Sequence, residues 1–295
     1  MRTLRLPAGR YIVAVSGGVD SVVLLDILNQ QTDLELVVAH FDHGIRIDSQ
    51  ADRLLVEGLA KHYGLPFVYE VTKLGAHASE ETARQARYAF LKKAMSKYHA
   101  VAIITAHHQD DSIETAIINL LRGTNRRGLS SLRSTTIIKR PLLSVKKSEL
   151  IKYARSHNLS WREDTTNQDE NYLRNKVRHQ LTLASELDKK KFLSLIQSET
   201  RVNDSIDKII VDLLARQVKS RRLTRQWFIE LPYIVSKEVL ARWLSLNGVS
   251  NINRKRLEQL ATNLKTATPN KRLDVNGRLV IVINKEYLAL KTLDR

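Results

Sequence analysis

Cysteine is absent from the 295-residue sequence. This absence excludes disulfide bonds, zinc sites built on thiolates, iron–sulfur clusters held by the chain and covalent catalysis by a thiol. No apolar run approaches the ~20 residues that a membrane-spanning helix requires. The first apolar segment alternates and leads into a glycine turn, unlike the core of a signal peptide. We therefore expect a cytoplasmic protein with no membrane partner.

Acidic residues are scarce relative to basic ones. The chain has 31 Asp and Glu against 48 Lys and Arg, a formal net charge of +17. The imbalance is uneven, because 17 basic residues against 6 acidic ones between Arg216 and Arg295 give this segment a net charge of +11. A basic half on one chain favours a nucleic acid as partner. A generally basic proteome is the alternative explanation.

The first half of the chain alternates apolar strand patterns with helical periodicity. This alternation predicts an α/β fold, a doubly wound parallel sheet with ligands at the carboxyl ends of its strands. The expected strands span 11–15, 34–40, 66–71, 100–105 and 135–139. The expected helices span 20–30, 49–63, 79–98, 110–121, 146–157, 172–183 and 187–214.

The pattern changes after about residue 220. Short helices are expected over 238–246 and 254–264, followed by a hairpin with Asn276-Gly277 at its turn, a strong hairpin signal. These elements predict a small α+β module. We therefore divide the chain into 1–185, 186–220 and 221–295, with the middle segment as a helical linker.

The segment SGGVDS, Ser16 to Ser21, lies between the first expected strand and the first expected helix. Gly17 and Gly18 permit a tight turn and the close approach of a ligand, and a helix N-terminus binds anions. The segment is therefore a candidate phosphate site, although an ordinary turn capped by Asp20 or Ser21 is the alternative. The chain has no Gly-Lys pair, which excludes a Walker A loop.

Carboxylates near this turn indicate a divalent cation. An acidic residue such as Asp20 inside a phosphate cradle needs a cation between the charges, which indicates Mg²⁺. On a helix over 110–122, Glu114 falls within the apolar arc and Asp111 at its edge. A core-facing carboxylate is costly unless it is paired or binds a metal. A favourable interaction with the helix dipole is the alternative to a metal site, and it explains Asp111 well but Glu114 poorly.

Two other groups of residues near the expected strand ends are candidates for ligand contacts. His107 and His108 favour contacts to a nucleotide or substrate over zinc. Arg84 and Arg87 lie within an apolar stripe and suit a phosphate or carboxylate, with snorkelling surface arginines as the alternative. Arg122, Arg126, Arg127 and Arg133 lie in a basic segment with glycines and serines, which suits a phosphate backbone or is a solvated run of charge. Arg174 and Arg178 are four residues apart on one helix face.

Taken together, these motifs resemble the tRNA(Ile)-lysidine synthetase family. The resemblance covers about residues 12–183 and rests on SGGVDS, HFDHGIR, ETARQARY, TAHHQDDSIETAIINLLRG with GLSSL, RPLL and WREDTTNQDENYLRNKVRH. SGGxDS defines only the ATP-pyrophosphatase-loop superfamily, whereas the segments AHHxDDxxET with LRG and YxRNxxR are specific to the family. Thr166 stands where a serine is frequent, and the C-terminal segment carries no matching motif.

The resemblance implies a ligase that forms a carbon–nitrogen bond. The wobble cytidine, position 34 of tRNA(Ile) with a CAU anticodon, is adenylated by ATP at its C2 carbonyl oxygen with release of pyrophosphate. The ε-amine of free L-lysine then displaces AMP and gives lysidine, which pairs with A instead of G. The resemblance also implies an adenine nucleotide alpha hydrolase-like fold of the N-type ATP pyrophosphatases, and it suggests a homodimer.

The resemblance assigns roles to individual residues and to the segments of the chain. The ATP-binding residues are Ser16, Gly17, Gly18, Val19, Asp20, Ser21, Asp42 and His43. The Mg²⁺ ligands are Asp20, Asp111 and Glu114, and the catalytic residues are these three with Arg87 and Arg122. The tRNA-binding residues are Arg126, Arg127, Arg174 and Arg178. The resemblance also implies that residues 1–185 form the ATP-pyrophosphatase catalytic domain. For residues 221–295, the net charge of +11 between Arg216 and Arg295 leads us to expect a basic tRNA-binding domain.

Three alternative functions remain to be weighed. A tRNA-thiolating enzyme of the same superfamily carries sulfur on cysteines or clusters, which this chain lacks. A nitrogen-adding synthetase of the NAD or GMP type acts on small substrates, which the net charge of +17 and the absence of a glutaminase segment oppose. A non-enzymatic RNA-binding protein with a relic nucleotide fold would not need an intact SGGVDS segment with Asp111 and Glu114.

Overall fold

The computed structural model describes residues 4–44, 49–72, 80–123, 126–130, 132–162, 173–249 and 252–293. The chain divides into two compact units, Met1–Thr200 and Arg201–Arg295. The boundary falls inside helix α7 (Glu186–Gln217), within the segment expected to be a linker. The expected division at residues 185 and 220 stays a prediction. The family comparison at Thr166 concerns a residue outside the described ranges.

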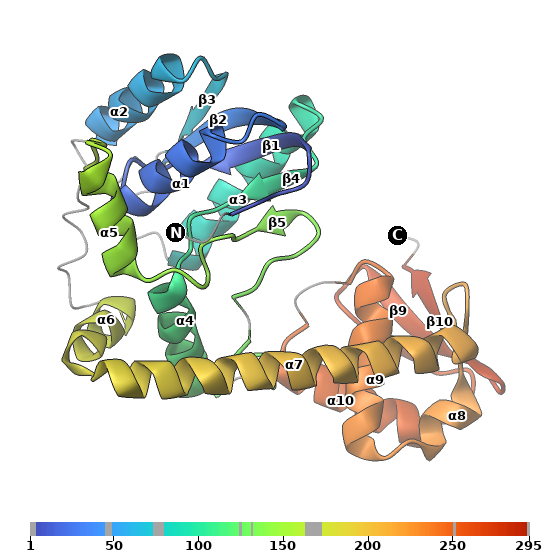
Figure 1. Ribbon diagram of the computed structural model, residues 1–295. Helices are drawn as coiled ribbons and strands as arrows, with labels where there is room; N and C mark the ends of the chain where they lie inside the picture. Colours follow the sequence, from blue (N-terminus) through green and yellow to red (C-terminus); the bar gives the residue numbers. More distant parts are fainter. Residues whose placement is uncertain are drawn as a thin grey trace. The chain divides into compact units, whose positions relative to one another are not determined.

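The first unit contains a five-stranded sheet in the order β3-β2-β1-β4-β5 (Figure 1). Every neighbouring pair is parallel, as the alternating pattern predicted. The chain adds β2 and β3 on one side of β1, then returns to add β4 and β5 on the other. The strands are β1 (Gly9–Ala14), β2 (Leu34–Asp42), β3 (Phe67–Val71), β4 (Ala102–Ile104) and β5 (Ile138–Lys139).

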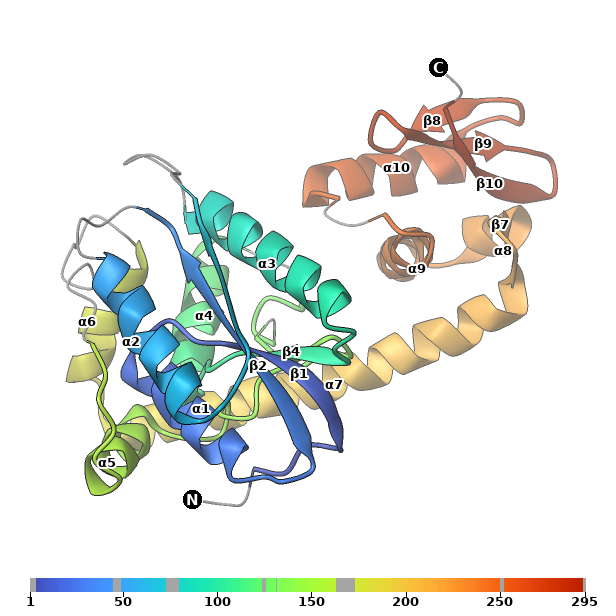
Figure 2. The same cartoon turned by 90° about the horizontal axis from the view of Figure 1, so that it is seen from above.

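Helices cover both faces of this sheet (Figure 2). Tyr11 and Val13 of β1 pack against α1, α2 and α5, whereas Ile12 between them packs against α3. This alternation follows from the period-2 geometry of a strand. Helix α1 is apolar almost throughout because it is largely buried. The helices are α1 (Val19–Asn29), α2 (Ser49–His62), α3 (Glu80–Lys97), α4 (Gln109–Leu121), α5 (Lys147–Ser156) and α6 (Leu173–Leu183).

Most observed ends of elements in this unit lie within two residues of the expected ones, but β5 is shorter. It was expected over 135–139 and begins at Ile138. Thr135 starts a local turn instead: its N–H donates to Ile138 O at 2.7 Å, and its hydroxyl accepts from Ile138 N at 3.0 Å. These bonds occupy the backbone of Thr135 in a turn, while Ile137 O still accepts from Ile103 N of β4 at 2.9 Å.

The second unit pairs helices with an antiparallel sheet in the order β6-β7-β10-β9-β8. The expected hairpin is confirmed, since β8 and β9 flank Asn276-Gly277 and Gly277 has φ +76°. Trp243, Phe228 and Leu223 are fully buried in its core. The strands are β6 (Val218–Lys219), β7 (Arg222–Thr224), β8 (Arg272–Asp274), β9 (Leu279–Ile283) and β10 (Tyr287–Thr292). The helices are α8 (Arg225–Glu230), α9 (Tyr233–Leu246) and α10 (Arg254–Thr266).

Helix α9 begins five residues before the expected start at 238. Pro232 is its N-cap residue, with φ −53°, and the Ser236 N–H donates the first helical bond to Pro232 O at 2.9 Å. A proline fits a helix start because its fixed φ is already near the helical value and its missing N–H would be unpaired there. None of the helices in the described residues combines the length and apolarity that crossing a bilayer demands.

Candidate functional site

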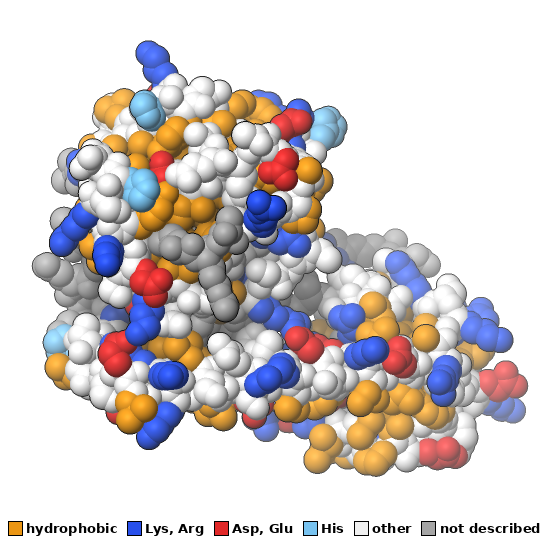
Figure 3. Space-filling view, in the orientation of Figure 1, with side chains coloured by type: hydrophobic (Ala, Val, Ile, Leu, Met, Phe, Trp, Pro, Cys, Tyr) orange, Lys and Arg blue, Asp and Glu red, His pale blue; other side chains and the backbone are white. Residues whose placement is uncertain are grey.

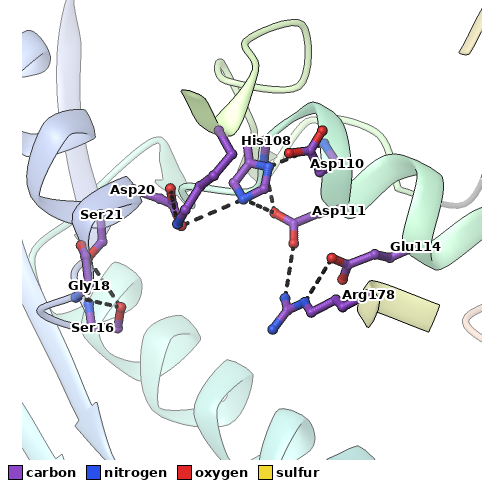
Figure 4. Close-up of polar contacts among 10 residues, drawn as sticks. Ser16, Gly18, Asp20, Ser21, His108, Asp110, Asp111, Glu114 and Arg178 are labelled. Atoms are coloured by element: carbon purple, nitrogen blue, oxygen red, sulfur yellow. Dashed lines mark hydrogen bonds and ion pairs between the residues drawn. The ribbon is translucent and has the colours of Figure 1, made fainter. Parts of the chain in front are cut away.

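The candidate site lies at the carboxyl ends of β1 and β4, where the strand order reverses. β1 and β4 are neighbours in the sheet, although the chain visits β2 and β3 between them. The segment after β1 is the glycine turn, and the segment after β4 leads to His108 and helix α4. Ligands bind open α/β sheets at such a switch point. Figure 4 shows the polar side chains that the two segments bring together.

The glycine turn is held by its own serines. Ser21 Oγ donates to Gly18 O at 2.9 Å and accepts from Ser16 N at 3.1 Å. Ser16 Oγ lies 3.2 Å from Ser21 Oγ and accepts from Gly18 N at 3.4 Å. Gly17 has φ +95°, a conformation that favours glycine. The buried Ser21 hydroxyl therefore shapes the loop.

The glycine turn leads into α1, and the N-terminus of this helix suits an anion. Gly18 is the N-cap residue and makes no side-chain cap bond, so capping by Asp20 or Ser21 is wrong as an explanation of the turn. The helix bonds at this end begin with Ser21 N and Val22 N, which both donate to Gly18 O at 3.1 Å. The N–H groups of Val19 and Asp20 belong to the first turn, where they have no partner within the helix and suit an anion.

Arg162 and Asp52, which were not identified from the sequence, support the glycine turn. Arg162 N donates to Gly17 O at 3.0 Å, and Arg162 Nε donates to Asp52 Oδ1 at 2.7 Å. A Cβ on Gly17 would lie 3.6 Å from both the Cβ and the backbone oxygen of Asp52. Asp52 is buried in the first turn of α2, which lies far from the turn in sequence.

Asp20 and Asp111 flank His108. His108 Nε2 lies 3.7 Å from Asp20 Oδ2 and 3.5 Å from Asp111 Oδ2 (Figure 4). Asp20 is also bound by Lys147, whose Nζ donates to both carboxylate oxygens at 2.7 Å. Asp20 belongs to α1, Asp111 to α4 and Lys147 to α5, and His108 directly precedes α4. The tertiary fold therefore creates this cluster.

A capping box fixes Asp111. His108 N donates to Asp111 Oδ2 at 2.9 Å, while Asp110 N donates to His108 Nδ1 at 3.2 Å. Burial would raise the pKa of Asp111, but His108, His107 and Arg178 outweigh burial and hold this pKa below its usual value. Asp111 is therefore an anion at neutral pH.

Glu114 faces the interior, as its position in the apolar arc predicted. Its side chain is 5% exposed, and Oε1 accepts from Arg178 Nε at 2.8 Å. Burial raises the pKa of Glu114 above its usual value although Arg178 acts in the opposite direction. Within the described residues, the buried Oε2 has no hydrogen-bond partner. A buried oxygen of this kind needs a ligand or water.

Arg178 joins the two carboxylates of α4. Besides its bond to Glu114, its Nη2 lies 3.6 Å from Asp111 Oδ1. The family resemblance assigned Arg178 to tRNA binding, and the structure places its guanidinium in the carboxylate cluster. Its role in tRNA binding stays a prediction. The signal for the observed position was weak, because the spacing of Arg174 and Arg178 defines a helix face and not its partner.

The carboxylates suit Mg²⁺ by their chemistry. Asp20, Asp111 and Glu114 offer the oxygen ligands that Mg²⁺ prefers, and Glu114 Oε2 lacks a partner among the described residues. Over those same residues, no three His, Asp or Glu side chains already form a metal cluster. In this conformation Lys147 and Arg178 supply the positive charge instead.

A second polar group surrounds His107. His107 Nδ1 lies 2.9 Å from Thr105 Oγ1. Burial lowers the pKa of His107 to about 3, and Arg140, Arg87 and Arg84 act in the same direction. Helix α3 therefore brings Arg84 and Arg87 toward the strand ends, as their stripe predicted. Arg140 is buried and was not assigned a role from the sequence.

Asp42 is the last residue of β2, and His43 follows it at the same edge of the sheet. Asp42 Oδ1 accepts from Gly44 N at 2.8 Å. Burial lowers the pKa of His43, and Arg87 contributes to the same shift. Asp42, His43 and Arg87 therefore lie near one another, beside the first strand's end.

The remaining candidate arginines lie at the end of α4, on the segment after it and on α6. Arg122 is exposed at the C-terminal end of α4, eleven residues beyond Asp111, which corresponds to ~16 Å along a helix. Arg126 and Arg127 follow it and are half-buried, as is Arg174 on α6. Arg174 lowers the pKa of Glu114 by its charge and therefore lies near that carboxylate. The assigned roles of all four residues stay predictions.

Comparison with known proteins agrees with this geometry. The model of a family described as the PP-loop domain matches residues 3–185. Proteins named tRNA(Ile)-lysidine synthase are similar: one from Solibacter usitatus is 38% identical over 175 residues, covering 58% of this chain and 40% of the relative. One from Thermus thermophilus is 42% identical over 185 residues, covering 60% and 36%. One from Nitrosomonas europaea is 30% identical over 282 residues, covering 90% and 61%.

These relatives confirm the resemblance found in the sequence, but the chain spans less than two thirds of their length. Among solved structures, the U34-tRNA thiolase of Methanococcus maripaludis with its [4Fe-4S] cluster has a TM-score of 0.57. It is 15% identical, and the match covers 68% of this chain and 76% of that one. At this identity the likeness concerns the fold, and it confirms the expected α/β class.

Proposed function

The chain belongs to the PP-loop domain family, and from that premise we propose that it is an ATP-dependent lysidine-forming ligase acting on tRNA(Ile). The observation that carries the proposal is the meeting of the SGGVDS turn with Asp111 and Glu114 at one switch point. The relatives named tRNA(Ile)-lysidine synthase, 30–42% identical, support the choice of reaction within the family.

The proposed reaction has two steps. The C2 carbonyl oxygen of cytidine 34 in the CAU anticodon attacks the α-phosphorus of ATP, and the bond to pyrophosphate breaks. The ε-amine of free L-lysine then attacks C2, loses a proton, and expels AMP as the carbon–oxygen bond breaks. Bringing three substrates together removes a large entropic barrier, so positioning supplies much of the catalysis.

The site offers separate positions for the moieties of ATP. The start of α1, with Gly17 and Gly18, suits the pyrophosphate because its N–H groups and dipole face an anion. Asp42 and His43 at the end of β2 suit the adenosine. Arg87 and Arg84 of α3 reach the strand ends and suit the phosphates or the orientation of substrates.

Asp20, Asp111 and Glu114 would hold Mg²⁺. The ion, when bound, neutralises charge on the phosphates. The ordered capping box at His108 keeps Asp111 in place for this role, and burial keeps Glu114 from solvent. Glu114 Oε2, unpartnered among the described residues, is the oxygen with most to gain from a ligand.

The basic surface is the proposed tRNA contact. Arg126, Arg127 and Arg174 lie on segments adjoining the carboxylate cluster, and the second unit carries most of the excess positive charge. Figure 3 shows Lys and Arg side chains spread over this face of each unit rather than gathered in one patch. The net charge of +11 between Arg216 and Arg295, and not a single patch on this face, is therefore what supports a phosphate backbone as partner. The cytoplasmic location and the homodimer stay predictions.

One incubation tests the proposal. The protein is mixed with ATP, Mg²⁺, labelled lysine and total bacterial tRNA, and the label is mapped by nuclease digestion. We expect the label at cytidine 34 of one tRNA, with AMP and pyrophosphate formed in equal amounts. RNA binding without nucleotide turnover would favour the non-enzymatic alternative, and ADP as the main product would exclude the proposed step at the α-phosphorus.

A further inference from the structure

Helices α1 and α5 are joined by two polar links with the same offset. Lys147 of α5 bonds Asp20 of α1, and Tyr153 of α5 donates to Asp26 of α1 at 2.7 Å. Asp20 and Asp26 are six residues apart on α1. Their partners Lys147 and Tyr153 are six residues apart on α5 in the same order, so the two helices run parallel. Figure 1 shows α1 and α5 as neighbours on one face of the sheet.

The second link is reinforced by two further hydrogen bonds, whereas the further partner of Asp20 in the first link is His108 Nε2, at 3.7 Å. Asp26 also accepts from Tyr63 at 2.7 Å and from Gln30 at 3.0 Å. Lys147, in contrast, reaches Asp20 with the end of a long side chain from the first turn of α5. The fixed link anchors α5 beside α1, while a four-carbon stem allows the Lys147 ammonium to move.

The Lys147 ammonium occupies the face of Asp20 that a metal ligand needs. Its Nζ lies 2.7 Å from both Asp20 oxygens, and the two side chains are 36% and 25% exposed. An ammonium and a divalent cation cannot share both oxygens, because the two positive charges repel at such short range. Lys147 therefore competes with a metal ion for the charge and the lone pairs of Asp20.

We propose that Lys147 is a further phosphate-binding residue of this site, stored on Asp20 until Mg²⁺-ATP binds. The inference rests on the proposed function in that it takes the glycine turn to be an ATP site. On binding, the Lys147 side chain leaves Asp20 and its ammonium pairs with the phosphates held at the start of α1. Lysine suits phosphate as a compact, mobile charge.

The adjacent Lys146 provides a matched control. Its Nζ pairs with Glu186 of α7 at 2.6 Å, away from the glycine turn. Lys146 and Lys147 thus have the same chemistry and one carboxylate partner each, but only Lys147 faces Asp20. Neither pair is deeply buried, and exposed ion pairs contribute little to folding. The variants Lys147→Met and Lys146→Met should therefore both fold.

Two binding measurements with opposite expected signs test the proposal. Without nucleotide, Mn²⁺ binding is followed by electron paramagnetic resonance as a probe of the carboxylates. Lys147→Met should bind Mn²⁺ about fivefold more tightly than wild type, because the competing ammonium is gone. The same variant should bind Mg²⁺-ATP at least about tenfold more weakly in calorimetry, because it lacks one charged partner for the phosphates.

The remaining variants decide between this role and a structural one. Lys146→Met should match wild type in both assays, and Lys147→Arg should keep Mg²⁺-ATP affinity within about threefold, since the charge is retained. Lys147→Gln replaces Lys147→Met if the latter unfolds. Equal Mg²⁺-ATP affinity in wild type and Lys147→Met, or weaker binding of both probes, would overturn the proposal. Failure of wild type itself to bind Mg²⁺-ATP would instead refute the proposed function.

Discussion

At the scale of single residues, the site combines side chains that the sequence could and could not identify. Glu114 was identifiable because helical periodicity places a carboxylate in an apolar arc, and its burial confirms that prediction. Lys147, Asp52 and Arg162 were not identifiable. Periodicity shows which face of one helix a residue occupies, but their partners lie 110–127 residues away in sequence. Only the packing of helices on the sheet determines such pairs.

Removing charge from the carboxylates of α4 should abolish lysine incorporation. We expect Asp111→Asn and Glu114→Gln each to lower incorporation at least about 100-fold, since both remove an anionic oxygen proposed to stabilise charge at the phosphates. Labelled lysine in tRNA is the readout, and a filter assay should show tRNA binding within about twofold of wild type. Asp110→Asn is the matched control, because only the Asp110 backbone N–H takes part in the capping box. Normal incorporation in Glu114→Gln would refute its metal role.

Two glycines should respond to alanine with opposite signs. Gly17→Ala adds a Cβ to a residue whose φ is +95°, a conformation that L side chains rarely adopt. This substitution should lower the free energy of unfolding by about 1–2 kcal/mol. Gly58 lies within α2, with no atom within 4 Å of a Cβ added there. Gly58→Ala should therefore raise the free energy of unfolding by about 0.5–1 kcal/mol. Urea unfolding measures both, and a Gly17→Ala protein as stable as wild type would contradict the observed turn geometry.

At the scale of elements, alternation of strands and helices was enough to predict the parallel sheet. Errors occurred where elements are short or where local bonds compete. β6 has two residues and β7 three, too few to display a period of two, and α8 has only six. The start of β5 was misplaced because Thr135 closes a turn with its hydroxyl. Longer helices, such as α2 and α4, were predicted to within one residue at each end.

The tyrosines that tie α1 to α2 and α5 should make stability fall at high pH. Burial and the bond to Asp26 raise the pKa of Tyr63, and the same causes raise that of Tyr153 to about 12. Both tyrosines therefore ionise more readily in the unfolded chain. Their contribution is complete below about pH 10 and is lost as the pH rises toward 12.

Thermal unfolding of wild type and of the double variant Tyr63→Phe with Tyr153→Phe, followed from pH 8 to 11, measures this contribution. We expect a constant difference in melting temperature up to about pH 9.5 and a shrinking one above it. A difference that grows with pH would mean that the tyrosines are anionic in the folded state, contrary to their bonds with Asp26.

At the scale of the whole molecule, the net charge is the property that is best read from the sequence. The structure adds little about where this charge acts. The net charge of +11 between Arg216 and Arg295 needs no fold to be counted. The structure adds that Ile210 and Leu214 of α7 belong to the core of the second unit. A truncation near residue 220 would therefore remove a piece of that core, and neutralising surface lysines is the cleaner way to test the charge.

Replacing exposed lysines of the second unit by glutamine should weaken tRNA binding without affecting ATP. Suitable positions are Lys219, Lys255, Lys271, Lys285 and Lys291, all exposed. For every lysine that pairs with a phosphate, its replacement should reduce the slope of log affinity against log salt by about 1. Filter binding over a range of salt gives the slope, and calorimetry checks that ATP affinity is unchanged. An unaltered slope would show that this charge does not touch the tRNA.

The link between Arg178 and Glu114 joins residues that are synthesised at different times. The acidic members Asp20, Asp111 and Glu114 leave the ribosome first, Lys147 follows, and Arg178 comes last. At about 5–20 residues per second, the chain from Asp20 to Arg178 takes about 8–32 s to make. From its own synthesis until that of Arg178, 64 residues later, Glu114 lacks the guanidinium that bonds it in the finished protein. A nascent chain therefore carries its anions before the cations that balance them, and the site is completed only after α6 has emerged.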